Sequence, residues 1–222
     1  MIKFILNRKL FDWFQDFRYI LLLIAYFLVL WVPIIFQAFG LDQQLTDISL
    51  FVLILAIFNF IRKNSVYTKV FSFVSLVIIS GRGAAVGTEN ENISVISWVL
   101  MLVYFIFFLR ILLIEVWNAK KVNMNTILGA IAGYVQIGVI AFILFKVLDI
   151  LLNNHAFTTT VSISDLIYFS FVTLTTVGYG DITPASDEVK AFSVIFAMVG
   201  QFYMAILMAL LVGKYQQEHS KQ

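Results

Sequence analysis

Long apolar runs, separated by short polar breaks, occupy most of this 222-residue chain. A helix needs about 20 mostly apolar residues to cross the hydrocarbon core of a bilayer. Six runs come near or exceed that length, and they cover residues 19–39, 47–61, 66–86, 93–117, 127–152 and 188–213. A seventh run, residues 163–174, is too short to cross and is followed by glycines. The pattern predicts an all-α membrane protein with six transmembrane helices and one re-entrant helix.

Residues near the ends of these runs predict where the helices begin and end. Pro33 interrupts the first run, which a membrane helix tolerates as a kink. Thr46 and Asp47 are expected to cap the second helix, and Arg62 and Lys63 to close it. Three tryptophans fall near span ends, where indole rings favour the membrane interface: Trp31, Trp98 and Trp117.

Composition agrees with a membrane protein and argues against several other classes. Hydrophobic residues make up 61% of the chain and charged residues 13%, and the mean hydropathy is +0.95. The net charge of +2 gives no basic field for nucleic acid. Cysteine is absent, and the two histidines, His155 and His219, are isolated, so we predict neither an enzyme nor a cofactor. The first apolar run is too long for a signal peptide.

Basic residues predict the orientation in the membrane. With the N-terminus inside, eleven of the fifteen basic residues fall on the cytoplasmic side. These are Lys3, Arg8, Lys9, Arg18, Arg62, Lys63, Lys69, Lys120, Lys121, Lys214 and Lys221. We therefore expect a multi-pass plasma-membrane protein with cytoplasmic termini. The predicted parts are an N-terminal tail, a four-helix domain, a linker, a pore domain and a C-terminal tail: residues 1–18, 19–117, 118–126, 127–213 and 214–222.

The segment after the short run, residues 173–181, reads Thr-Leu-Thr-Thr-Val-Gly-Tyr-Gly-Asp. Consecutive backbone carbonyls can replace the hydration shell of an ion, provided that they all point one way. That arrangement needs alternating backbone conformations, some with positive φ, which Gly178 and Gly180 adopt cheaply. Val177 and Tyr179 would pack behind the carbonyls, and the Thr176 hydroxyl would add a last ring of ligands.

The heptapeptide from Thr175 to Asp181, placed between a short helix and an apolar span, resembles the selectivity filter of potassium channels. The resemblance implies a homotetrameric pore in the lipid bilayer, with K+ as the permeant ion bound at Thr176, Val177, Gly178 and Tyr179. Four helices, one per subunit at residues 163–174, would aim the negative ends of their dipoles at the cavity. Ser164 and Asp165 are expected to cap the helix and to complement its dipole.

Asp181 in this family hydrogen-bonds behind the filter to a residue of the pore helix. The acidic partner's position is occupied here by Val172, so we expect Tyr168 to take that role, with Phe169 beside it. With Thr175, these residues form the predicted filter support.

The last span predicts the cavity and a possible gate. Gly200 is either a hinge of the kind found in this family or a point of close helix packing. Gln201, Met204, Ala205 and Met208 share one helical stripe, and the polar Gln201 favours a stripe that faces the cavity. Residues 200–207, Gly-Gln-Phe-Tyr-Met-Ala-Ile-Leu, resemble small bacterial proteins of the ion channel family.

The first four spans resemble a voltage-sensor domain without its arginine ladder. The fourth span carries only Arg110, which we expect to pair with an acidic group or to snorkel, so strong voltage sensing is rejected. Lys146 is expected to snorkel or to pair with Asp149 or Asp165.

Two alternatives to a channel stay open at this stage. A potassium uptake transporter would carry four degenerate loops on one chain, whereas this chain has the full motif once. A non-conducting membrane partner would keep the filter only as structure. The sequence shows no recognisable sensor domain, so it does not reveal what stimulus would open the channel.

Overall fold

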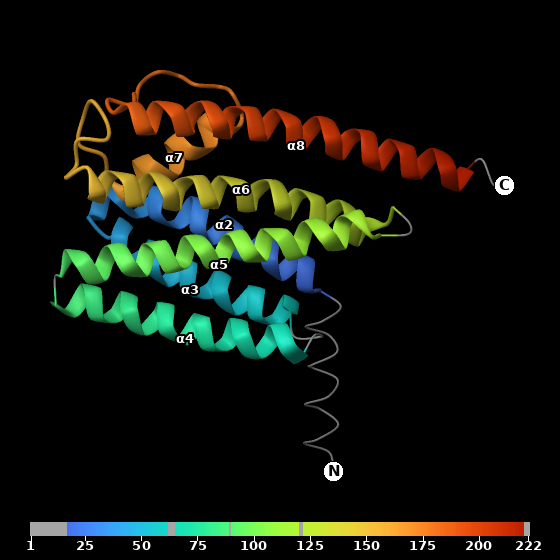
Figure 1. Ribbon diagram of the computed structural model, residues 1–222, viewed down its shortest axis with the longest axis horizontal. Coiled ribbons are helices and arrows are strands. Elements are labelled where there is room, and N and C mark those ends of the chain that lie inside the picture. Colours follow the sequence, from blue (N-terminus) through green and yellow to red (C-terminus); the bar gives the residue numbers. More distant parts are fainter. Residues whose placement is uncertain (1–16, 62–64, 89, 120–121, 220–222) are drawn as a thin grey trace, which may run out of the picture.

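The computed structural model describes residues 17–61, 65–88, 90–119 and 122–219 (Figure 1). Its elements are α2 (Arg18–Phe36), η1 (Gln37–Phe39), α3 (Asp42–Ile61), α4 (Ser65–Thr88), α5 (Glu91–Trp117), α6 (Met124–Leu151), α7 (Ile163–Leu174) and α8 (Asp187–His219). Six of these helices, all except α7, are long and apolar enough to cross a membrane. The predicted all-α fold with six spans is confirmed, and the short helix has the predicted bounds.

The helices form one elongated bundle, with α4 at one edge and α8 at the other (Figure 1). The short helix α7 lies between α6 and α8, and the loops on both sides of it meet at one end of the bundle, which we call the α7 end. There, Phe157 and Pro184 form an antiparallel bridge between the two loops. The start of α2 and the end of α8 lie at the opposite end (Figure 1).

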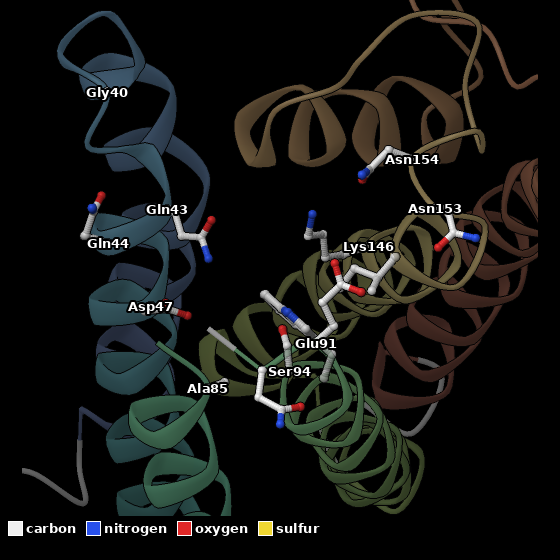
Figure 2. A pocket seen from close by; sticks show the side chains of 13 residues that line it. Gly40, Gln43, Gln44, Asp47, Ala85, Glu91, Ser94, Lys146, Asn153 and Asn154 are labelled. Carbon is white, nitrogen blue, oxygen red and sulfur yellow. The ribbon is translucent and has the colours of Figure 1, made fainter. Parts of the chain in front are cut away.

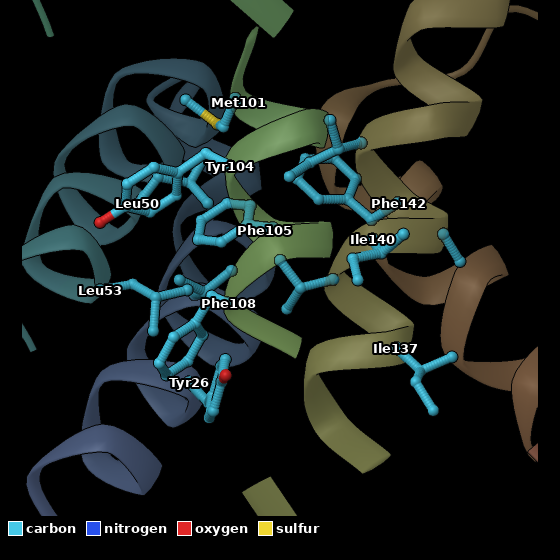
Figure 3. Packing of buried hydrophobic residues seen from close by; sticks show 14 of the residues in the cluster. Tyr26, Leu50, Leu53, Met101, Tyr104, Phe105, Phe108, Ile137, Ile140 and Phe142 are labelled. Carbon is cyan, nitrogen blue, oxygen red and sulfur yellow. The ribbon is translucent and has the colours of Figure 1, made fainter. Parts of the chain in front are cut away.

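Helix α5 is packed on two sides, which joins the four-helix part to the rest of the bundle. Phe105 and Phe108 are fully buried toward α2 and α3 (Figure 3). On the other side, Trp98 makes a T-shaped contact with Phe142 of α6, at 5.9 Å between ring centroids. The buried Gln136 of α6 adds a polar link, because it accepts a hydrogen bond from Tyr26 of α2 and donates one to a carbonyl of α5. A buried amide with partners on both its oxygen and its nitrogen stabilises such a core, whereas an unpaired one would be costly.

The predicted start of the second span was wrong. Helix α3 begins at Asp42, so Thr46 and Asp47 lie within its first turns and do not cap it. Asp47 instead accepts two hydrogen bonds from Arg82 of α4, at 2.6 and 3.0 Å, and Arg82 is only 7% exposed. The predicted closing residues Arg62 and Lys63 lie outside the described residues.

Trp98 was also assigned to the wrong environment. It is 1% exposed, and the Arg82 guanidinium lies 4.2 Å from the centre of its ring. It therefore belongs to the core at the α7 end, held by a cation–π contact. Trp31 and Trp117 are half or more exposed, in agreement with an interfacial position.

The two parts of the bundle are also tied at the end opposite α7. Lys214 of α8 donates hydrogen bonds to the carbonyl oxygens of Val116, Trp117 and Ala119, at 3.3, 2.8 and 2.7 Å. A lysine at a helix C-terminus satisfies unpaired carbonyls and complements the helix dipole. Helix α8 continues to His219, so part of the predicted C-terminal tail is helical.

Gly200 lies at a close approach between α8 and α7. A Cβ added there would overlap the carbonyl oxygen of Leu174, the last residue of α7. The contact supports the close-packing interpretation of this glycine, and α8 runs through it without interruption.

We predict that Gly200→Ala lowers the melting temperature of the purified protein in detergent by several degrees, because α7 must shift away from α8. Gly213→Ala is the matched control on the same helix, since a Cβ there has no neighbour within 4 Å. Alanine gains about 1 kcal/mol over glycine in a helix interior, so the control is expected to be neutral or more stable. Equal melting temperatures for the two variants would contradict the packing role of Gly200.

Candidate functional site

The N-terminus of α7 is fixed by a reciprocal capping box. The Ser162 hydroxyl oxygen accepts a hydrogen bond from the Asp165 N–H at 3.1 Å, and the Asp165 carboxylate accepts one from the Ser162 N–H at 2.8 Å. The predicted cap, Ser164, was therefore wrong by two residues, and its buried hydroxyl contacts Ser162 instead. Asp165 lies in the first turn as expected, where its charge complements the helix dipole.

Residues 175–181, which we call the signature segment, leave α7 with an alternating backbone. The φ angles are positive at Thr176 (59°), Gly178 (50°) and Gly180 (80°), that is, at every second residue. Positive φ was predicted for the two glycines. Thr176 was missed, because a β-branched residue rarely adopts this conformation. The sequence did contain a signal for it: Gly178 and Gly180 are two positions apart, and the same spacing leads back to Thr176.

In the signature segment the backbone N–H groups donate hydrogen bonds, whereas no hydrogen bond to its carbonyl oxygens is described. The N–H groups of Thr175, Thr176, Val177 and Gly178 all donate to carbonyls in the last turns of α7, at 2.9 to 3.1 Å. Among the described hydrogen bonds, none is accepted by a carbonyl oxygen of residues 175–180. Buried or membrane-embedded carbonyls need partners. The segment therefore presents a row of acceptor oxygens that another group can bind.

The depth of the segment follows from its contact with α8. The Gln201 amide donates to the Thr176 hydroxyl oxygen at 3.1 Å. Gln201 lies near the middle of the α8 span, Asp187–Lys214. Thr176 is therefore level with the middle of a membrane-crossing helix. This pairing was not predicted, since the sequence indicated only that Gln201 avoids lipid and favours the cavity.

Tyr168 and Asp181 form the predicted contact. The Tyr168 hydroxyl donates to the Asp181 carboxylate at 2.8 Å. Tyr179 stacks parallel to Tyr168 at 6.5 Å between centroids, on the α7 side of the segment. The ring contacts described for Phe169 are with Phe145 and Phe157 in the core.

One face of α8 and the signature segment remain exposed in the single chain. In the apolar 18-residue stretch of α8 only 11% of the residues are buried, compared with 67% in that of α6. The predicted stripe lies on this exposed face, with Met204 44% and Met208 54% exposed. Val177 and Tyr179 are 52% and 72% exposed.

The charged residues of the spans have the following partners. Lys146 pairs with Asp149 at 3.7 Å, one of the two predicted partners, while Asp165 is used by the capping box. Glu115 pairs with Arg18 of α2. Arg110 is exposed on α5, and no ion pair is found for it within the described ranges.

The oxygens that could hold a cation here are the carbonyls of Thr176, Val177, Gly178 and Tyr179 and the Thr176 hydroxyl. Within the described residues, no group of three or more histidine, cysteine or acidic side chains could hold a metal ion.

Comparison with known proteins identifies the same part of the chain. The family model described as "Ion channel" matches residues 130–217, which include α7 and the signature segment. Two-pore potassium channel 2 of Arabidopsis thaliana is 34% identical over 93 residues, 42% of this chain and 20% of that protein. Two pore potassium channel c of Oryza sativa subsp. japonica is 45% identical over 51 residues, 23% of this chain and 11% of that protein.

Two-pore potassium channel 3 of Arabidopsis thaliana is 35% identical over 80 residues, 36% of this chain and 17% of that protein. The chain thus spans about a fifth or less of the length of these relatives. No solved structure matches it. The relatives are named potassium channels, which are not enzymes, and this agrees with the prediction that no enzyme is encoded here. Residues 130–217 are therefore similar to the ion channel family, and the relatives that the chain resembles are named potassium channels.

Proposed function

We propose that this chain is one subunit of a potassium-selective channel that conducts K+ passively through a homotetrameric pore. The observation that carries the proposal is the alternating backbone of residues 176–180, whose carbonyl oxygens have no described hydrogen-bond donors. In the proposed tetramer, rings of these oxygens replace the hydration shell of the ion at Thr176, Val177, Gly178 and Tyr179.

A single segment cannot surround an ion, which is why the proposal requires several copies. The exposed side chains of Val177, Met204 and Met208 would then face neighbouring subunits or the central cavity. The relatives are named two-pore channels, whereas this chain carries the motif once, so we propose that four chains supply the four strands. The C-terminus of α7 would direct its partial negative charge toward the cavity.

The proposed orientation places the α7 end outside the cell membrane and both termini in the cytoplasm. It rests on the excess of lysine and arginine at the opposite end of the bundle, where Arg18 and Lys214 lie. The signature segment would then open toward the outer solution. Thr176 and Gln201 would lie at its inner end, where the Gln201 amide fixes the position of the Thr176 hydroxyl oxygen.

The transporter and non-conducting alternatives are less well supported. The motif is present once and complete, and the named relatives are channels. Voltage is not proposed as a strong stimulus, because α5 carries a single arginine and each charge moved supplies roughly 2.3 kcal/mol per 100 mV.

We expect the purified protein in liposomes to pass potassium in large excess over sodium, measured as ion flux in matched gradients. Gly178→Ala should abolish this flux, because alanine is strained at φ near +50°. Gly213→Ala, on the same chain but away from the segment, is the control. Equal sodium and potassium fluxes would refute potassium selectivity, and no flux would favour the non-conducting alternative.

Tyr168→Phe should speed inactivation several-fold in single-channel recordings, because Asp181 loses the donor that holds it beside α7. Asp181→Asn should have the same effect. Tyr104→Phe is the matched control, since its hydroxyl bonds to Ser75 within the four-helix part. Unchanged gating in both Tyr168→Phe and Asp181→Asn would count against a supporting role.

Arg110→Gln should leave the midpoint of the conductance–voltage curve nearly unchanged in planar bilayers. A single exposed arginine contributes little gating charge on which the membrane field can act. A large shift of the midpoint would show that α5 does sense voltage.

A further inference from the structure

A large polar cavity opens at the α7 end, between the four-helix part and α6. Its volume is about 800 Å³, within the size range of small-molecule sites. Figure 2 shows Gln43 and Asp47 on α3 facing Lys146 of α6 across the cavity, with Glu91 and Ser94 of α5 between them. Asn153 and Asn154, which follow α6, complete the rim.

Two of the charges on its walls, Asp47 and Lys146, have buried partners. Both hydrogen bonds from Arg82 to Asp47 run to the same oxygen, Oδ1, so Oδ2 keeps acceptor capacity. Lys146 lies 3.7 Å from Asp149, which is longer than a hydrogen bond, so the ammonium keeps donor capacity. The cavity therefore has an acidic wall, formed by Asp47 and Glu91, and a basic wall, formed by Lys146.

A second cavity of about 400 Å³ adjoins the first and is mainly apolar. The two share Gln44 and Asp47 in their linings. The second one runs between α3 and α4, along Ile48, Phe51 and Ile79, all of which are at least 38% exposed. A polar cavity that continues into an apolar groove matches a lipid, which has a polar head group and an apolar chain.

We propose that these two cavities bind a phospholipid whose zwitterionic head group carries a primary ammonium, as in phosphatidylethanolamine. The ammonium donates to Asp47, Glu91 and the amide oxygens of the rim, and the phosphate accepts from Lys146. One acyl chain lies in the groove between α3 and α4. The site is independent of whether the protein conducts ions, and it faces the leaflet on the α7 side.

A primary ammonium fits better than the trimethylammonium of phosphatidylcholine. An ammonium has three N–H donors for the carboxylate and amide oxygens, whereas a trimethylammonium has none. Trimethylammonium is usually bound by open aromatic faces. Trp98, which lines this cavity, already carries the Arg82 guanidinium 4.2 Å from its ring centre and the edge of Phe142.

The test measures lipid retained by the full-length protein after exchange into nanodiscs of defined composition, by mass spectrometry. Phosphatidylethanolamine should be retained several-fold over phosphatidylcholine and phosphatidylglycerol. Glu91→Gln and Lys146→Met should each remove that preference, while Glu188→Gln, exposed at the start of α8 and outside the cavity, should keep it. Lys146→Arg, which keeps the charge, should also retain the lipid and controls for folding.

Binding of the soluble head group, glycerophosphoethanolamine, tests whether the occupant is a lipid or a free zwitterion of the same chemistry. We expect it to bind much more weakly than the lipid, and Ile79→Trp, which fills the groove, should weaken only the lipid. Binding of the soluble compound as tightly as the lipid would overturn the lipid assignment. Equal retention of the three phospholipids, or retention unaffected by Glu91→Gln and Lys146→Met, would overturn the site.

Discussion

Backbone groups that leave a helix at membrane depth must find partners, and this constraint shapes the C-terminal half of the molecule. The signature segment meets it for its N–H groups by folding back on the last turns of α7, so that four consecutive N–H groups have carbonyl partners. Its own carbonyl oxygens are left on the other side. The alternation of φ at Thr176, Gly178 and Gly180 produces that separation of donors from acceptors. A permeating cation is the partner that we propose for them.

The neighbouring elements hold this strained segment in place. The capping box at Ser162 fixes one end of α7, and the contact of Gly200 with Leu174 fixes the other against α8. Gln201 positions Thr176 from the α8 side, and Tyr168 positions Asp181 from the α7 side. Thr176 has an unfavourable φ for a β-branched residue, which persists only where its surroundings determine it. The Gln201 contact is one such determinant.

The sequence predicted those features that depend on local pattern. Hydropathy located all six spans, and the bounds of α7 agreed to the residue, because apolar length and flanking polar residues are local signals. It failed where a partner comes from another helix. Asp47 looked like a cap because Arg82 is 35 positions away in sequence, and Trp98 looked interfacial for the same reason. Ser164 was predicted as the cap, whereas the structure caps α7 with Ser162, the residue before the helix begins.

The four-helix part contains a buried arginine, Arg82, which pairs with Asp47, although it has no ladder of arginines. A charged side chain inside a membrane protein is costly, and it persists where it has partners or a function. Arg82 has an acidic and an aromatic partner, and both line the cavity at the α7 end. Lys146 of α6 lines the same cavity. An occupant of that cavity would contact both parts of the bundle at this end, as Lys214 joins them at the other. Because Lys146 lies on α6, which packs against α7, such an occupant would act close to the proposed filter without touching it.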